Sequence, residues 1–204
     1  QPWFPGYEIK GEGVFIELDA EKISEWEQQT IIKNRTSILN RNYVRSFTGK
    51  SRPDRHIKPG FILVHTLAHL LLIQMSFDCG YNVASLKERI YYGTNSDGKK
   101  RAGILIYTSS GDSEGSLGGL VRLGQPDIFP KIYQNAINKA RSCSNDPVCN
   151  CSTGQGKESL NLAACHSCVL LPETCCEERN AFLDRGMIVG TFENRNIGFW
   201  NDIL

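Results

Sequence analysis

The stretch that decides the fold is GFILVHTLAHLLLIQMSFDC, residues 60–79. It contains the longest apolar run in the chain, from Phe61 to Phe77, which also holds His65 and His69. The run is too short and too polar to span a bilayer, so we predict a buried core helix instead. Gly80 follows directly, and glycine is a typical residue just after a helix ends.

Segments on either side of this helix predict a small sheet. GVFIEL (residues 13–18) places alternate apolar residues on one face, and AGILIYT (residues 102–108) is short, apolar and β-branched. Residues 30–60 have weak periodicity and many cations, which predicts a partly irregular basic connector. Helical patterns occupy residues 21–29, 85–92, 127–142 and 177–189. The fold class we predict is α+β, a small sheet packed on a central buried helix.

We divide the 204 residues into three segments. Residues 1–59 form a strand and helix lead-in with the basic connector, residues 60–142 form the α/β core, and residues 143–204 form a zinc-binding segment with a C-terminal helix. The formal net charge of +1 gives no global field for nucleic acid, so any such binding needs a local patch. The start lacks a signal-peptide pattern, so we expect a fragment of a longer cytoplasmic protein.

The cysteines predict a metal site. Seven of the eight lie between residues 143 and 176, and in a reducing compartment such density indicates metal more than disulfides. Cys165 and Cys168 form a CxxC pair, whose tight turn brings both sulfurs to one side of a tetrahedral ion. Zn²⁺ is the expected cofactor; an iron–sulfur cluster and buried free thiols are the alternatives. The predicted ligands are Cys149, Cys165, Cys168 and Cys176, with Cys143 as the substitute for Cys149 and adjacent Cys175 as the alternative to Cys176.

A second constellation lies on the central helix. His65 and His69 are spaced i, i+4, which allows chelation of one metal, although HTLAH lacks the glutamate of HExxH. The alternative is a pair of core histidines with polar partners. A hydrolase or nuclease site would need these histidines to meet nearby carboxylates in an open cleft. Its candidate catalytic residues are His65, His69, Glu88, Asp112 and Glu114.

Cations near the middle of the chain are candidates for nucleic-acid binding. A solvated linker and structural ion pairs are the competing interpretations of the same residues. The glycine-rich loop after residue 108 has no Walker A motif, and nothing indicates a small-molecule substrate. The candidate phosphate-binding residues are Arg52, Arg55, Lys58 and Arg89.

Several long motifs resemble one family. LVHTLAHLLL, GYNVASLKERIYYG, GILIYTSSGDSEGSLGGLVRLG, CSNDPVC and ACHSCVLLPETCCEERNAFLDR are similar to the C-terminal domain of DrmB proteins of the DISARM antiphage defence system. WFPGYEIKGEGVFIELD also resembles the segment leading into that domain, so the resemblance covers nearly the whole chain. A related zinc-binding domain ends DNA-repair helicases of the MrfA type.

The resemblance implies a zinc-binding accessory domain that works with a DrmA-like helicase partner on DNA. The family's cysteine pattern maps onto five positions, which leaves Cys151 and Cys175 as extras. Three functions therefore stand: an accessory domain that binds DNA or a helicase partner, a hydrolase, and a pure protein-interaction module. The five positions are Cys143, Cys149, Cys165, Cys168 and Cys176.

Overall fold

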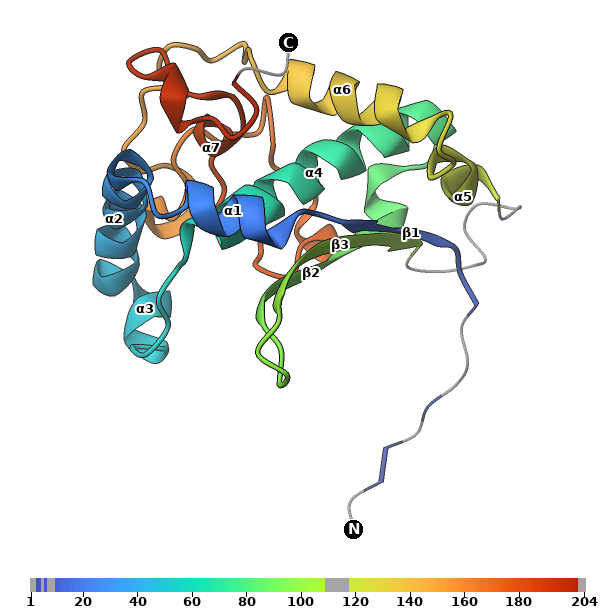
Figure 1. Cartoon of the computed structure of the whole chain (residues 1–204), viewed down its shortest axis with the longest axis horizontal. Coiled ribbons are helices and arrows are strands. Elements are labelled where there is room, and N and C mark those ends of the chain that lie inside the picture. The colour runs from blue at the N-terminus through green and yellow to red at the C-terminus, as the bar shows by residue number, and fades with distance from the viewer. Residues whose placement is uncertain (1–2, 5, 7–9, 109–117, 202–204) are drawn as a thin grey trace.

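The computed structural model of the chain describes residues 3–4, 6, 10–108 and 118–201. Within them lies a three-stranded antiparallel sheet of order β1-β3-β2, built from β1 (Gly13–Glu17), β2 (Leu86–Thr94) and β3 (Lys100–Thr108). The sheet packs on one long helix, so the predicted α+β class is confirmed (Figure 1). Asp112 and Glu114 lie outside the described residues.

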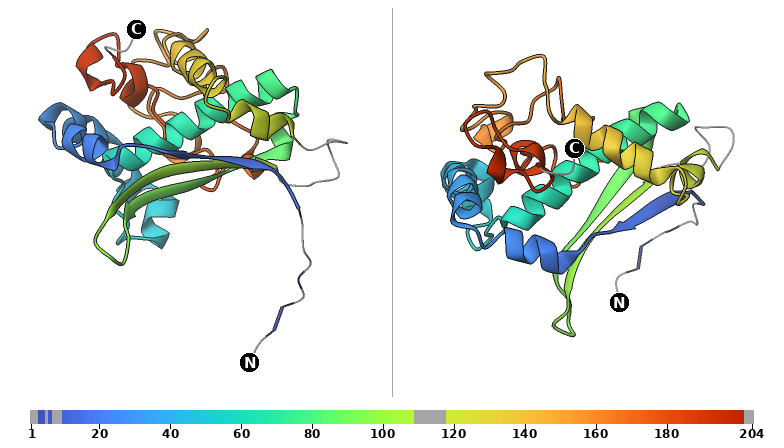
Figure 2. Two further views of the ribbon diagram at one scale, coloured as in Figure 1. Left: turned by 45° about the vertical axis from the view of Figure 1, so that its right-hand side comes forward. Right: turned by 45° about the horizontal axis from the view of Figure 1, so that its top comes forward.

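Helices form the other layers. Short 3-10 turns at Val83–Ser85, Lys157–Ser159, Glu173–Cys175 and Arg195–Ile197 complete the elements in the described part of the chain. The helices are α1 (Ala20–Trp26), α2 (Thr30–Arg45), α3 (Phe47–Ser51), α4 (Pro59–Cys79), α5 (Gly119–Leu123), α6 (Phe129–Lys139) and α7 (Gly186–Val189). Figures 1 and 2 show α4 running between the sheet and a layer that contains α6 and α7.

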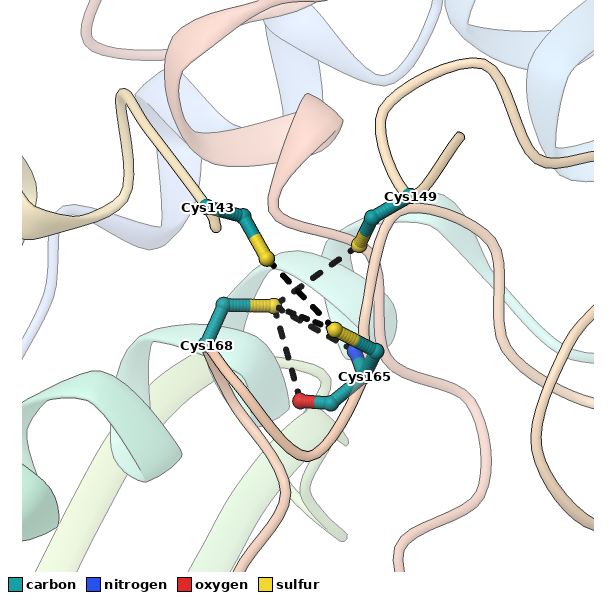
Figure 3. A group of neighbouring side chains, drawn as sticks. All are labelled: Cys143, Cys149, Cys165 and Cys168. Atoms are coloured by element: carbon teal, nitrogen blue, oxygen red, sulfur yellow. Dashed lines mark hydrogen bonds between the residues drawn. The ribbon is translucent and has the colours of Figure 1, made fainter. Parts of the chain in front are cut away.

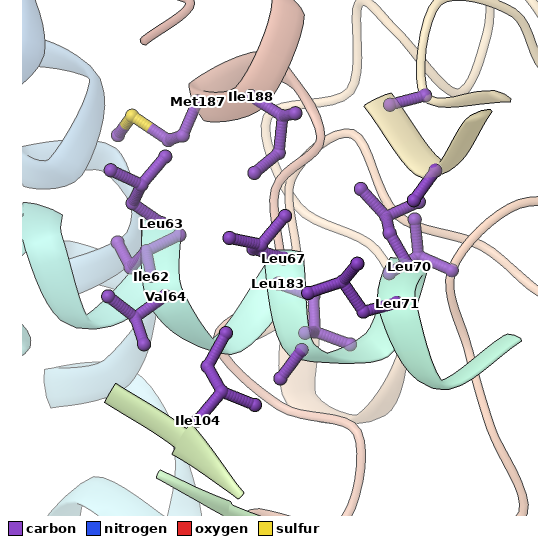
Figure 4. Packing of buried hydrophobic residues seen from close by; sticks show 14 of the residues in the cluster. Ile62, Leu63, Val64, Leu67, Leu70, Leu71, Ile104, Leu183, Met187 and Ile188 are labelled. Carbon is purple, nitrogen blue, oxygen red and sulfur yellow. The ribbon is translucent and has the colours of Figure 1, made fainter. Parts of the chain in front are cut away.

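Helix α4 is buried along most of its length, as the sequence predicts. Proline at its first position suits the fixed φ of a helix start, and Gly80 ends it in the left-handed region at φ 76°. The sequence argument that this run is too short and too polar to span a bilayer is wrong, since α4 has the length and composition to cross a membrane. The predicted burial is nevertheless present, with 78% of its most apolar window buried inside the protein. Figure 4 shows why: Met187 and Ile188 lie on one side of the helix and Ile104 on the opposite side.

One face of the sheet supplies this cover. In β3 the side chains of Ala102, Ile104 and Ile106 point to the core, and β2 pairs with β3 so that Glu88 stands opposite Ile106. Neighbouring Arg89 points to the other face and is exposed. The two residues therefore lie on different faces of the sheet.

Three predicted segments need correction. Of the predicted helix at residues 85–92, residues 86–92 lie in strand β2, because LKERIYYG alternates between core and solvent and pairs along its length with β3. The supposed irregular connector contains α2 and α3; α2 buries only a narrow stripe, which weakens its apolar periodicity. The predicted helix at residues 177–189 is reduced to α7, since Arg179, Asn180 and Phe182 have positive φ and Phe182 N–H donates to the Leu160 carbonyl.

A single cluster of buried apolar side chains extends from Ile16 to Trp200, so all three sequence segments contribute to it. Leu67 lies at its centre and is fully buried on α4 (Figure 4). Phe77, two turns or more further along the same helix, is 76% exposed.

Leu67→Ala is therefore expected to lower the free energy of unfolding by about 2–5 kcal/mol, because it leaves a cavity in a packed core. Chemical denaturation measures the change. Phe77→Ala is the matched control on the same helix, with an expected loss below about 1 kcal/mol from its contact with Lys139. Equal losses in the two variants would contradict this placement of α4.

Candidate metal centre

Four cysteine sulfurs converge between two loops. Cys143 and Cys149 come from the loop after α6, and Cys165 and Cys168 come from a tight turn in which Cys168 and Val169 both donate backbone N–H groups to the Cys165 carbonyl. Figure 3 shows the four side chains pointing toward one another. These four residues form the first cluster, here named the four-cysteine cluster.

The spacing of the sulfurs fits a tetrahedral zinc ion. The Sγ atoms of Cys143 and Cys165 are 3.5 Å apart, those of Cys165 and Cys168 3.7 Å, and those of Cys149 and Cys168 3.8 Å. Zinc–sulfur bonds of ≈ 2.3 Å in a tetrahedron place the sulfurs about 3.8 Å apart. Four protein ligands fill such an ion's coordination, which is the pattern of a structural site.

The loop that carries the first cysteine pair is organised by one carboxylate. Asp146 accepts the backbone N–H of Cys143 at 2.9 Å and that of Asn150 at 3.1 Å. It also accepts a hydrogen bond from the fully buried guanidinium of Arg185, which in turn donates to the Ala140 carbonyl at the end of α6. Asp146 therefore fixes the direction from which Cys143 reaches the cluster.

Nearby donors favour the thiolate of Cys165, whereas burial raises the pKa of Cys149 and Cys168. Asn145 donates its side-chain amide to Cys165 Sγ at 3.4 Å. Burial opposes ionisation, but this bond and the Ser167 backbone N–H lower the pKa of Cys165 to about 7. Burial also disfavours the charged form of Arg185, yet Asp146 and the thiols of Cys149 and Cys168 raise its pKa. A permanent positive charge thus lies beside sulfurs that must be deprotonated to bind metal.

The structure brings Cys143, and not Cys176, together with the other three predicted ligands. Cys176 Sγ lies 3.2 Å from His65 Nε2, away from the other predicted ligands. Adjacent Cys175 points elsewhere, with Sγ 3.2 Å from the Val83 carbonyl, and Cys151 is exposed. The sequence predicts Cys143 only as a substitute for Cys149. Spacing along the chain does not show which of the two joins the CxxC pair, or that both do.

A second cluster surrounds the histidines of α4. His65 and His69 lie one turn apart, β2 brings Glu88 from the sheet, and Cys176 follows the 3-10 turn at Glu173–Cys175. We name these residues the His-Glu-Cys cluster; their ligand atoms all lie within 4.8 Å of one another. The predicted approach of Glu88 to both histidines is present in the structure.

The hydrolase hypothesis requires an open cleft at these residues. His65 and His69 have no exposed surface, Glu88 is 2% exposed and Cys176 is 7% exposed. Within the described residues, this burial leaves a substrate no open cleft in which to meet the cluster. The burial of all four side chains therefore argues against a hydrolase site here.

Two of the predicted nucleic-acid-binding residues are committed to ion pairs. Arg55 holds Glu178 through two hydrogen bonds, and Arg89 donates to Glu177 at 2.8 Å. Arg52 and Lys58 are exposed. Nothing in these contacts tests nucleic-acid binding, so it stays a prediction.

The family model of the MrfA Zn-binding domain matches residues 67–169, just over half of the chain. The matched range contains the whole four-cysteine cluster. This α+β chain, with its four converging sulfurs, therefore belongs to the MrfA Zn-binding domain family.

One curated relative extends the similarity to almost every residue. The chain is 38% identical over 206 residues to the DISARM protein DrmB of Bacillus paralicheniformis (strain ATCC 9945a / NCIMB 11709 / CD-2). The alignment includes 99% of this chain and 36% of the relative, so the chain spans about a third of that protein. The resemblance to the DrmB family is confirmed.

Removing one ligand is expected to abolish zinc binding at the four-cysteine cluster. Cys143→Ser should lower bound zinc by about one equivalent per chain, because three sulfurs no longer close the tetrahedron. Elemental analysis of the purified chain measures the ratio. Cys151→Ser, which removes an exposed thiol of the same loop, should keep the full amount. Retention of all zinc in Cys143→Ser would contradict the assignment.

Asp146→Ala tests the support of the first cysteine pair. We expect zinc affinity at the four-cysteine cluster to fall roughly 10- to 100-fold, the usual cost of losing an outer-shell partner. Competition with a chromophoric chelator measures affinity. Asp54→Ala, an exposed carboxylate, serves as control and should bind zinc like the unmodified chain. Equal affinity in both variants would show that Asp146 does not orient the ligands.

Proposed function

We propose that this chain is a zinc-stabilised accessory domain of a protein in DISARM antiphage defence. The observation that carries the proposal is similarity to a DISARM protein along 99% of the chain. The closed set of four sulfurs supports a structural role for zinc, since such a site keeps no open position for substrate. All eight cysteines are free thiols, which suits work in the reducing cytoplasm.

The proposal includes contact with the DNA backbone through helix α2. A groove beside this helix contains three cations, Lys33, Arg41 and Arg45, that form no ion pair within the described part of the chain. Cations without carboxylate partners are free to neutralise phosphates. The groove is lined by Lys33, Thr36, Ser37, Asn40, Arg41, Val44, Arg45, His56 and Pro59.

This groove is a better candidate than the arginines first named from sequence. Arg55 would have to leave Glu178 and its position over the ring of Phe182 before it could bind a phosphate. Arg41 donates to the Ser37 hydroxyl at 3.1 Å and forms no ion pair within the described residues, so a phosphate contact costs it little. Exposed Lys58 adjoins Pro59, which lines the groove, so it can extend the same basic surface.

A helicase of the DrmA kind is the proposed protein partner. Support for this partner comes from the similarity to a DISARM protein, because the proteins of one defence system act together. Affinity purification of the full-length protein with its helicase neighbour tests the partnership. Recovery of the helicase only when this domain is present would support it, and recovery without the domain would contradict it.

Binding of the chain to a fluorescent DNA duplex should weaken roughly 10- to 100-fold between about 50 and 200 mM salt, because a few neutralised phosphates release counterions. The double variant Arg41→Ala, Arg45→Ala should weaken binding and reduce the salt slope by roughly one unit for each cation removed. Fluorescence anisotropy measures both quantities.

Lys100→Ala is the control for this experiment, because Lys100 is a surface cation that pairs with Glu21 at the far end of β3. It should change neither affinity nor slope. Binding that ignores salt and the Arg41 and Arg45 substitutions would contradict DNA contact and favour a pure protein-interaction module.

A further inference from the structure

We propose that the His-Glu-Cys cluster is a second metal site, separate from the four-cysteine cluster and filled by a divalent transition metal, best matched by Zn²⁺. Its ligands would be His65 Nε2, His69 Nε2, a Glu88 carboxylate oxygen and Cys176 Sγ. The site joins three parts of the fold: helix α4, strand β2 and the segment after the 3-10 turn at Glu173–Cys175.

The distances between the donor atoms fit one small ion. His65 Nε2 lies 3.1 Å from His69 Nε2, 3.0 Å from Glu88 Oε1 and 3.2 Å from Cys176 Sγ. His69 Nε2 lies 3.3 Å from the same Glu88 oxygen. Zinc bonds of ≈ 2.0–2.3 Å in a tetrahedron require separations of about 3.3–3.6 Å. The observed separations agree within a few tenths of an ångström.

The ring protons of two neutral imidazoles do not satisfy this cluster. His69 Nδ1 lies 2.9 Å from the Val169 carbonyl, which can only accept, so Nδ1 carries a proton, and in the neutral ring Nε2 presents a lone pair. The carboxylate of Glu88 is also an acceptor, and so is the thiolate of Cys176. Several lone pairs thus converge where His65 can supply a single proton through Nε2, and a metal cation satisfies all of them together.

Unpartnered atoms point the same way. Glu88 Oε2 and His65 Nδ1 are buried without a hydrogen-bond partner in the described part of the chain. An unpaired buried carboxylate is costly, and such groups are commonly paired or coordinate metals. Hydrogen bonding alone leaves Glu88 incompletely satisfied, whereas a dication would neutralise its charge.

The chemistry of the donors selects the metal. Two imidazoles, one carboxylate and one thiolate suit zinc and related transition metals rather than Mg²⁺ or Ca²⁺, which prefer oxygen ligands alone. The two anionic ligands balance the charge of a divalent ion, so the buried site would be neutral. Four buried protein ligands close it to water, which is the pattern of a structural site.

Outer contacts hold two of the ligands in position. The Val169 carbonyl orients the His69 ring, in the way that metal-bound histidines are usually fixed. The backbone N–H of Asn180 lies 3.3 Å from Cys176 Sγ, a bond that favours the thiolate.

The MrfA Zn-binding match begins at residue 67 and ends at residue 169. Two of the four proposed ligands, His65 and Cys176, therefore lie outside the matched range.

The experiment compares metal content in matched cysteine variants of the chain, purified without chelator and measured by elemental analysis. The unmodified chain should hold about two equivalents of zinc, one for each closed site. Cys176→Ser and Cys168→Ser should each lose about one. Cys175→Ser is the control, because this neighbouring buried thiol belongs to neither cluster. Circular dichroism shows whether each variant is folded.

X-ray absorption at the zinc edge of the unmodified chain keeps the test decisive if Cys176→Ser does not fold. Two sites should give nitrogen or oxygen neighbours and a mean sulfur number clearly below that of a tetra-thiolate site. About one equivalent of zinc surrounded by sulfur alone, or a folded Cys176→Ser variant with unchanged zinc, would overturn the proposal and make the cluster a proton-sharing network.

Discussion

The constraint on which the structure depends is the burial of α4 along most of its length. A helix with apolar side chains on every face needs cover from every direction, and here the sheet, α6, α7 and the cysteine-rich loops provide it. Any polar group on such a helix must find its partners inside the protein. His65 and His69 therefore determine where Glu88, Cys176 and the Val169 carbonyl lie, so burial of one helix fixes the positions of the strands and loops around it.

How much of the fold the sequence predicts depends on how many faces of each element are buried. Helix α4 and strand β3 are buried widely enough to give clear apolar patterns, and both were predicted. Helix α2 buries a single stripe, Ile32, Thr36, Leu39 and Tyr43, with polar residues elsewhere, so its pattern is weak. Strand β2 was mistaken for a helix because its core-facing positions include Glu88, a charged residue that is buried only through tertiary contacts.

For the candidate sites too, the sequence predicts the residues that a local motif contains and misses those that tertiary contacts bring together. The CxxC turn is a local feature, so Cys165 and Cys168 could be named from spacing, and the density of cysteines indicated metal. The remaining pair depends on how two loops meet, which spacing does not encode; Asp146 and Arg185 determine it by holding Cys143 beside the turn. The position of the Cys176 side chain depends on how a C-terminal segment packs against α4. Its contact with His65 joins residues that are 111 positions apart.

The separations along the chain have a consequence for how the domain folds. The sulfurs of the four-cysteine cluster come from residues 22, 19 and 3 positions apart, so closing that loop costs little chain entropy. The contact between His65 and Cys176 closes a loop of 111 residues and brings in the sheet as well. Local contacts of the first kind form early, and those of the second kind form only as the whole chain collapses. The four-cysteine cluster can thus assemble while the polypeptide is still largely unfolded. The His-Glu-Cys cluster can form only when the whole chain has folded.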